Sequence, residues 1–253
     1  MTRSQRLLQM TDTHLLADPQ AHLSEVDVER RFQATLEAMR PWAERSDALV
    51  HTGDLVHDGS HTGYRRLQAA LATLDLPVRV IPGNHDDREV MAGVFKQGRV
   101  RAEHTLDMAD WLLITLDSLW PGEVSGRLAQ TELDALDQAL ALADAAHVLV
   151  ALHHPPVAVG TPWLDAIGLQ QAQTFWARLE AEPRLRGVLF GHIHHVYDGY
   201  REQVRLLATP ATAAQFLAAS PTFALDPAAP AFRCLDCFAD GRIETQVVHV
   251  PMD

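Results

Sequence analysis

Short apolar runs alternate with amphipathic stretches along most of the chain. The runs have the length of buried strands, and they predict strands at residues 6–10, 48–51, 78–81, 112–116, 148–152 and 188–190. Between them, Phe32, Leu36 and Met39 recur at spacings of four and three, and a similar spacing recurs over residues 133–140. These spacings place apolar side chains on one face of a helix. Alternating strands and helices predict an α/β domain.

The pattern changes after Val204. Three further strand candidates, RLLAT, AFRCLDCF and IETQVVHV, follow one another without a long helical pattern between them. We therefore expect one domain over residues 1–253, whose β-rich C-terminal part begins at about residue 204 and extends the same sheets. Residues 210–230 are rich in Ala and Pro and predict a long ordered loop, and such loops are often functional in compact domains.

Size and charge narrow the class of protein. A chain of 253 residues with 47% hydrophobic composition is long enough to bury a large core. The formal net charge of −12 argues against a nucleic-acid partner, because binding phosphates along a backbone requires a basic face. A small anionic substrate stays compatible, since bound metal ions can set the local field. The segment MTRSQRLLQM lacks the apolar core of a secretory signal, and no apolar run approaches the ~18 residues of a membrane span. We expect a cytoplasmic protein without a membrane partner.

The two cysteines, Cys234 and Cys237, form a CxxC motif. A structural zinc site would need two further ligands nearby, and the sequence has no second cysteine pair. The segment around them reads as a strand, in which residues three apart face opposite sides. We interpret both as ordinary reduced thiols.

Ligand-type side chains follow five of the predicted strands. The segments are Thr11-Asp12-Thr13-His14, Thr52-Gly53-Asp54, Pro82-Gly83-Asn84-His85-Asp86, His153-His154-Pro155 and Gly191-His192-Ile193-His194. In open α/β sheets the functional crevice lies at the carboxyl ends of the strands, so we expect these segments to share one site. Oxygen and imidazole ligands without thiolates suit Mn, Fe, Zn or Mg. Glycines precede Asp54, Asn84 and His192, where we expect close backbone approach.

The order DTH, GD, GNHD, H and GHIH over residues 12–194 resembles the calcineurin-like metallophosphoesterase superfamily. The segments GDLVHDGS, PGNHDDR, LDSLWPGEVSG, WLDAIGL and GHIHH, with the C-terminal run that begins ATPATAAQF, resemble its bacterial class III phosphodiesterases of the 3′,5′-cyclic AMP type. The resemblance implies a mixed α/β, four-layer αββα sandwich in which two facing mixed sheets are flanked by helices.

The same resemblance implies two metal ions per chain, Fe or Mn in the first instance, with Mg or Zn as alternatives. It assigns Asp12, His14 and His194 to the first metal, Asn84, His153 and His192 to the second, and Asp54 to both as a bridge. It implies substrate contacts for His14, Asp54, Asn84, His85 and His194.

Hydrolysis of a phosphodiester explains why such a set would be needed. Two metal ions hold a bridging hydroxide at neutral pH and offset the negative charge that repels a nucleophile. The alkoxide leaving group requires a proton, and His85 is the candidate catalytic donor, because Asn84 beside it points at a metal and the adjacent side chain must point elsewhere. The alternative is that His85 orients Asn84 or is a turn residue. Asp86 is a candidate support for the ligands and, with Glu89, a candidate N-cap of the next helix.

Several alternatives stay open at this point. The leading function is hydrolysis of 3′,5′-cyclic AMP to 5′-AMP, and the alternative is a broader activity on 2′,3′-cyclic nucleotides, glycerophosphodiesters or aryl phosphodiesters. A non-catalytic binding scaffold would predict damaged ligand positions, and none is substituted. We favour an exposed loop position for His57 over one at the pocket rim, and we expect His195 to help line the substrate side. Trp120, Trp163 and residues 216–223 flank the crevice or, as an equal alternative, pack the sheet edge or a subunit contact. The sequence leaves the oligomeric state open, a homodimer included.

Overall fold

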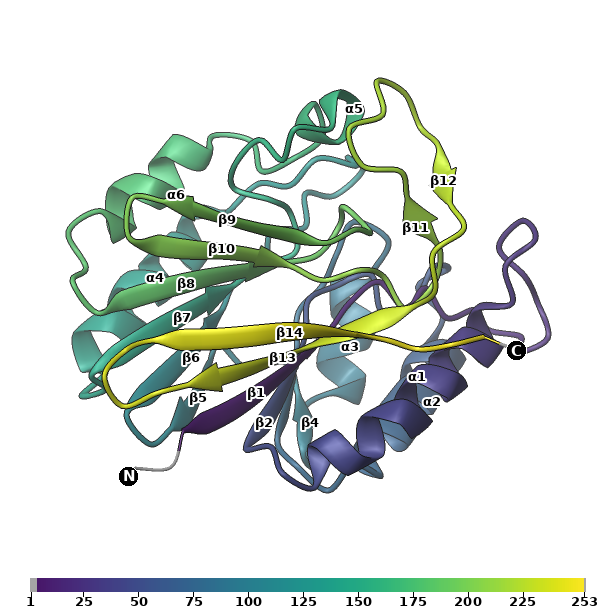
Figure 1. The fold of residues 1–253 in the computed structure, drawn as a ribbon, viewed down its shortest axis with the longest axis horizontal. Coiled ribbons are helices and arrows are strands. Elements are labelled where there is room, and N and C mark those ends of the chain that lie inside the picture. Colours follow the sequence, from purple (N-terminus) through teal and green to yellow (C-terminus); the bar gives the residue numbers. More distant parts are fainter. Residues whose placement is uncertain (1–3, 253) are drawn as a thin grey trace.

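The central strands are apolar on both faces, and this requires a layered fold. In β1 (Gln5–Met10), Leu7 packs into one hydrophobic core and Leu8 into another. In β7 (His147–Ala151), Leu149 packs into the same core as Leu7, and Val150 packs into a third core on the opposite face. Because each sheet must be covered on both sides, two sheets face each other and helices cover their outer faces (Figure 1). The structure is a computed structural model that describes residues 4–252.

The first sheet has the strand order β14-β13-β1-β2-β3-β4. Besides β1, its strands are β2 (Ala48–His51), β3 (Val78–Val80), β4 (Val100–Arg101), β13 (Ala231–Cys237) and β14 (Ile243–His249). The four strands β1 to β4 are parallel, whereas β13 and β14 are antiparallel to their neighbours. Three helices pack against its outer face: α1 (Val28–Ala43), α2 (His61–Ala72) and α3 (Arg88–Val94).

The second sheet has the order β5-β6-β7-β8-β10-β9. Besides β7, its strands are β5 (Thr105–Met108), β6 (Trp111–Thr115), β8 (Leu185–Phe190), β9 (Tyr197–Arg201) and β10 (Val204–Ala208). The central four strands are parallel, and the edge strands β5 and β9 are antiparallel to them. Three helices pack against its outer face: α4 (Gln130–Leu142), α5 (Pro162–Asp165) and α6 (Ala172–Leu179).

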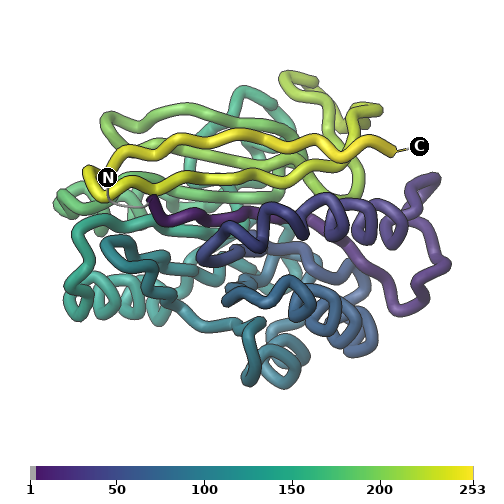
Figure 2. Tube along the Cα trace, turned by 60° about the horizontal axis from the view of Figure 1, so that its bottom comes forward, coloured from purple at the N-terminus to yellow at the C-terminus, as the bar shows by residue number. Residues whose placement is uncertain are grey.

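The predicted fold class is confirmed, and the C-terminal part extends both sheets. Strand β10 joins the second sheet, while β13 and β14 return to the first, where β13 lies beside β1 and β14 forms the edge (Figure 2). The six strands predicted before residue 204 all form, with ends shifted by at most three residues. The segment 210–230 differs from a plain loop, because it contains a short hairpin of β11 (Gln215–Phe216) and β12 (Leu225–Asp226).

The two cysteines lie on opposite faces of β13, as predicted. Cys234 packs in the core beneath α1 and α2, and Cys237 packs in the core between the sheets. Both are free thiols, and burial raises the pKa of each. Their side chains therefore do not form a shared metal or redox site.

The predicted ligand segments follow β1, β2, β3, β7 and β8, at the carboxyl ends of these strands. Over residues 4–252, the helices are too short or too polar to span a bilayer.

Candidate metal and substrate site

Backbone hydrogen bonds hold the loops after β1, β2 and β8 against one another. The Asp12 N–H donates to the Gly53 carbonyl, and the His14 N–H donates to the Asp54 carbonyl, each over 3.0 Å. The His192 N–H points at the Asp12 carboxylate, 3.2 and 3.3 Å from its two oxygens. Residues from three distant parts of the chain are thereby fixed in one place.

The backbone at most of the predicted ligands is strained. Five of them have positive φ angles: Asp12 (52°), His14 (46°), Asp54 (52°), His192 (70°) and His194 (51°). A non-glycine residue pays roughly 1–2 kcal/mol for this conformation. Such strain persists only where the surrounding structure imposes it, and it is concentrated at functional sites.

Two glycines allow the close approach that the sequence predicted. A Cβ on Gly83 would lie 2.2 Å from Asp54 Oδ1, and a Cβ on Gly191 would lie 2.2 Å from Thr11 Oγ1. Any larger residue at either position would therefore push the loops apart, and with them the carboxylates of Asp12 and Asp54.

Asp12, His14, Asp54 and His194 form a first buried cluster, with ligand atoms within 4.8 Å of one another. His194 Nδ1 lies 2.7 Å from the Ala214 carbonyl, which only an N–H can satisfy. In the neutral ring, Nε2 therefore presents a lone pair to Asp12 Oδ1, 3.1 Å away. A lone pair that faces a carboxylate is stabilised by a cation between them, so this cluster fits a metal ion.

His153, His192 and Asn84 surround the other side of Asp54. His153 Nδ1 donates to the Thr52 carbonyl over 2.7 Å, which directs Nε2 toward His192 Nδ1 at 3.3 Å. Asn84 Oδ1 is buried and has no hydrogen-bond partner among the described residues. An unsatisfied buried polar atom costs about 1–3 kcal/mol. A second metal ion would satisfy both the orphaned oxygen and the converging imidazoles.

Asp54 lies between the two clusters. Its Oδ2 is 3.5 Å from His14 Nε2 and 3.4 Å from His153 Nε2. One carboxylate therefore faces imidazoles from both clusters, which is the position that a bridging ligand must occupy.

His154 is close to His153 and His192 but is already engaged. Its Nε2 donates to the Val124 carbonyl over 3.1 Å, and its Nδ1 accepts from the Ser118 hydroxyl over 2.8 Å. Both ring nitrogens are used, so His154 anchors the loop that contains Val124 and is not a ligand candidate.

The charge states suit metal binding. Burial lowers the pKa of His14 and of His192 to about 3, which keeps both rings neutral. Burial alone would raise the pKa of Asp54, but His153 and His14 hold it well below its usual value. Burial alone would lower the pKa of His153, but the Asp54 carboxylate, together with Asp12 and the Thr52 carbonyl, raises it to about 9. Positive charge is therefore favoured beside Asp54, and a metal ion supplies it.

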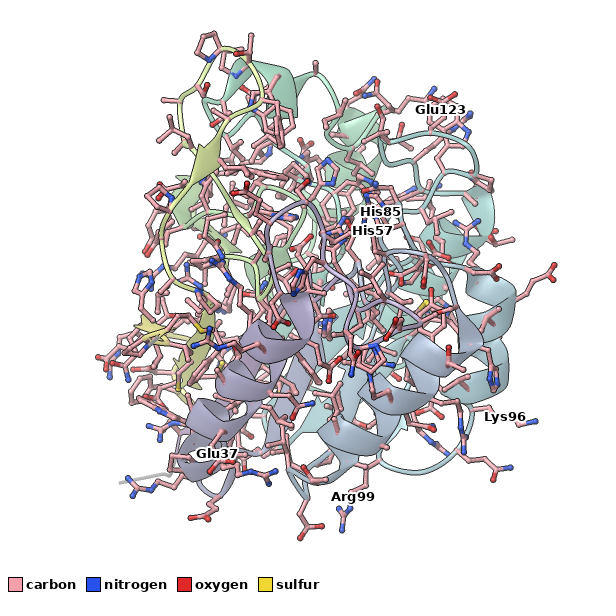
Figure 3. The ribbon with its side chains drawn as sticks, turned by 90° about the vertical axis from the view of Figure 1, so that its right-hand side faces the viewer. Glu37, His57, His85, Lys96, Arg99 and Glu123 are labelled. Atoms are coloured by element: carbon pink, nitrogen blue, oxygen red, sulfur yellow. The ribbon has the colours of Figure 1, made fainter. Side chains whose placement is uncertain are left out.

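His85 and His57 lie side by side over the site (Figure 3). Their rings stack with centroids 4.3 Å apart, and the His85 backbone N–H donates to Asp54 Oδ1 over 2.9 Å. His57 is half-buried, and its Nδ1 is 3.1 Å from His14 Nδ1. The expectation of an exposed loop histidine is wrong, because the His57 side chain turns inward to His14.

The Asp86 side chain holds the loops after β2 and β3 together. Its carboxylate accepts from the N–H groups of Leu55, Val56 and Gly83 and from the Tyr64 hydroxyl. Burial, reinforced by Asp54, raises the pKa of Asp86 to about 7.

The prediction that Asp86 caps the following helix is wrong. Because its side chain is turned inward, Asp87 caps α3 instead, and the Asp87 carboxylate accepts from the N–H groups of Glu89 and Val90. The contribution of Tyr64 was not foreseen, since nothing in the pattern of α2 distinguishes it from a core residue.

A cavity of about 360 Å³ opens onto this cluster. Its metal end is lined by His14, Asp54, His57, Asn84, His85, His192 and His194. Its apolar end includes Val124, Trp163, Phe216, Phe223 and Leu225. Two further residues whose place the sequence left open do not line this cavity. Trp120 lines a separate cavity, where Arg127 packs over its ring, and the described residues that line the site cavity do not include His195.

Both the sequence and the fold of this chain are similar to those of known proteins. The model of the calcineurin-like phosphoesterase family matches residues 5–196. A 3′,5′-cyclic adenosine monophosphate phosphodiesterase, CpdA, of Pseudomonas aeruginosa is 38% identical over 96% of this chain and 89% of its own length. The protein of the same description from Escherichia coli K12 is 37% identical over 96% of this chain and 88% of its own. A 3′,5′-cyclic-nucleotide phosphodiesterase of Nostoc is 36% identical over 97% and 92%.

Among solved structures, a dimetal phosphatase from Danio rerio superimposes with a TM-score of 0.69 over 99% of this chain and all of that chain, at 14% identity. At that identity the likeness concerns the fold alone.

Proposed function

The chain belongs to the calcineurin-like phosphoesterase family, and on that premise we propose that it hydrolyses 3′,5′-cyclic AMP to 5′-AMP at a dinuclear metal centre. The observation that carries the proposal is the position of Asp54, whose Oδ2 lies 3.5 Å from His14 Nε2 and 3.4 Å from His153 Nε2. The names of the similar proteins support the choice of substrate.

In this proposal the seven ligands divide between two metals as the family resemblance implies. Asp12, His14 and His194 would hold one metal ion, Asn84, His153 and His192 would hold the other, and Asp54 would serve both. When bound, the two ions would supply a bridging hydroxide as nucleophile and positive charge for the phosphate. Nitrogen and oxygen ligands without thiolates suit Fe or Mn, with Mg or Zn as alternatives.

The protein's own side chains do the remaining work. His85 lines the cavity at the metal end and donates a proton to the leaving alkoxide. His14, Asp54, Asn84 and His194 line the same end and surround the phosphate. Asn84 is a neutral oxygen ligand, so it holds a metal without cancelling the positive charge that attracts the diester.

A broader phosphodiesterase activity is the second candidate. It is favoured by the open apolar end of the cavity, where Val124 and Leu225 are 52% and 51% exposed and leave room for other organic groups. The substrates concerned are 2′,3′-cyclic nucleotides, glycerophosphodiesters and aryl phosphodiesters.

The test is steady-state hydrolysis of a panel of cyclic nucleotides and acyclic diesters, with the metal content measured on the same sample. We expect the highest kcat/KM for a 3′,5′-cyclic nucleotide, with the 5′-monophosphate as product. A higher kcat/KM for an acyclic diester would favour the second candidate, and no turnover of any diester by metal-replete protein would reject both.

A further inference from the structure

Three aromatic rings extend outward from His194 along the wall of the site cavity. The Phe216 ring lies parallel to the His194 imidazole, with centroids 4.0 Å apart and an angle of 6°. Trp163 contacts Phe216 at 5.1 Å and Phe223 at 5.5 Å, and the two phenylalanines are 5.4 Å apart. The interplanar angles of these three pairs, 65° to 75°, are the edge-to-face packing that aromatic rings prefer. We call Trp163, Phe216 and Phe223 the aromatic cluster.

Trp163 and Phe216 are half-buried, whereas Phe223 is exposed to an unusual degree for a large apolar ring. Phe223 is 61% exposed, and it lines the cavity together with the exposed side chains of Val124 and Leu225. In Figure 3 the β11–β12 hairpin lies on one side of His57 and His85, and Glu123, the neighbour of Val124, lies on the other. Apolar surface gathered around a cavity marks a place where a ligand or partner binds.

Hydrogen bonds fix the segments that carry the cluster. The Phe216 N–H donates to the His194 carbonyl over 3.2 Å. The Ala219 N–H donates to the Thr161 hydroxyl over 2.9 Å, which ties the hairpin to the residue before α5. The backbone on both sides of the cluster is therefore tied to the metal end and to α5.

We propose that the aromatic cluster is a nucleobase subsite, which recognises the flat face of the base and not its hydrogen-bonding edge. This inference rests on the proposed function. A cyclic nucleotide has an anionic phosphate and a neutral planar base, and the cavity has the matching division. With the phosphate at the metal ligands, the cluster begins at His194 and leads to the mouth, where the base would lie. Stacking of a base on an aromatic side chain contributes about 1–3 kcal/mol.

The side chains of the apolar end explain why the edge of the base is not read. Among the described lining residues outside the metal end, only Ser24 and Trp163 have a side chain that can form a hydrogen bond. No carboxylate, carboxamide or guanidinium group faces the base from there. Strong discrimination between similar ligands needs buried polar groups that one ligand satisfies and the other leaves unpaired. The subsite therefore accepts adenine and guanine alike.

The experiment compares Phe223→Ala and Trp163→Ala with Leu217→Ala as the matched control. Leu217 is a 45% exposed apolar residue of the same hairpin that is not among the described lining residues of the cavity. Three substrates are used: cyclic AMP, cyclic GMP, and the same cyclic ribose phosphate with a methoxy group in place of the base. Trp163→Phe, which keeps a ring, and thermal unfolding of each variant control for loss of folding.

We expect Phe223→Ala and Trp163→Ala each to raise the KM for both cyclic nucleotides by about 5- to 50-fold, with kcat nearly unchanged. The KM for the base-free substrate should not change, Leu217→Ala should match the wild type throughout, and the wild-type KM values for cyclic AMP and cyclic GMP should agree within about 5-fold.

Equal effects on the base-free substrate, or no effect on either nucleotide, would overturn the subsite and make the cluster structural. A cyclic GMP KM more than about 50-fold above that for cyclic AMP would overturn recognition by stacking alone. Wild-type protein that hydrolyses other diesters but no cyclic nucleotide would instead reject the proposed function, so the two failures are distinguishable.

Discussion

The two ends of the site cavity are built in different ways. The metal end comes from residues directly after five core strands, and its ligands, such as Asp12 and His153, are fully buried and held by neighbouring loops. The apolar end comes from α5, the β11–β12 hairpin and the loop that contains Val124, and Phe223 within it is 61% exposed. The difference teaches that the chemistry of this site depends on the sheets, whereas recognition depends on segments added to their rim.

Removal of the bridging carboxylate should have the largest effect on the metal end. Asp54→Ala removes a side chain that faces both clusters, so both metal ions should bind more weakly. We expect kcat/KM for cyclic AMP to fall by more than the ~10²–10⁴-fold contribution of a single general acid. Asp12→Ala, which faces one cluster, is the comparison. Equal losses in the two variants, with full metal occupancy in Asp54→Ala, would argue against a bridging role.

Loss of the proton donor should come next. His85→Ala keeps the backbone N–H that donates to Asp54 Oδ1, so both metal ions should stay bound. Turnover of cyclic AMP should fall by ~10²–10⁴-fold. A diester with a nitrophenol leaving group needs little proton assistance and should lose much less.

Three quantities decide the role of His85: metal content, the rate on cyclic AMP, and the rate on the activated diester. If metal is lost, His85 is structural. If both rates fall equally with metal in place, His85 binds the phosphate and does not protonate the leaving group.

A smaller effect is expected from His57, which supports a ligand and does not itself face the two carboxylates. Because His14 Nε2 is directed at Asp54, the proton of the neutral His14 ring is on Nδ1. His14 Nδ1 therefore donates to His57 Nδ1 over 3.1 Å. His57→Ala should weaken Mn²⁺ binding by about 10-fold, as expected for loss of a residue that orients a ligand. His57→Gln offers a carbonyl oxygen in its place and should recover most of the affinity. Unchanged Mn²⁺ affinity in His57→Ala would assign His57 to the cavity wall alone.

The smallest effect on catalysis should come from Tyr64, which acts through Asp86. Its hydroxyl donates to Asp86 Oδ1 over 2.8 Å in a buried setting and accepts the Asp87 N–H over 2.7 Å in a partly buried one. Tyr64→Phe should lower the free energy of unfolding by about 1–3 kcal/mol, measured by denaturant titration, with kcat within severalfold of wild type. Tyr200→Phe, at an exposed position of β9, should be neutral. A neutral Tyr64→Phe would show that water replaces these hydrogen bonds.

The metal end could be predicted from the sequence because each of its ligands lies next to a recognisable strand in the chain. Each candidate ligand directly follows an apolar run, so finding the strands also finds the ligands, as for Asp12 after β1 and His192 after β8. The close approach at Gly83 and Gly191 was likewise readable from residue type. The resemblance to a family added the division between two metals.

The apolar end and the supporting contacts could not be predicted in the same way. The strands β11 and β12 have two residues each, too few for a periodic pattern, and they lie in an Ala- and Pro-rich segment. The position of His57 depends on how the loop after β2 packs against the loop after β1, which is a tertiary contact between residues 43 apart in the chain. The predicted helix cap was wrong by one residue. The Asp86 carboxylate accepts tertiary hydrogen bonds instead, so Asp87 caps α3.

The most direct test of the account is a titration of metal-free protein with Mn²⁺, in which the initial rate of cyclic AMP hydrolysis is measured against the number of bound equivalents. The account predicts negligible turnover up to one equivalent, a rise as the second binds, and a plateau at two per chain. Full turnover in metal-free protein, or a plateau at one equivalent, would contradict a dinuclear centre bridged by Asp54.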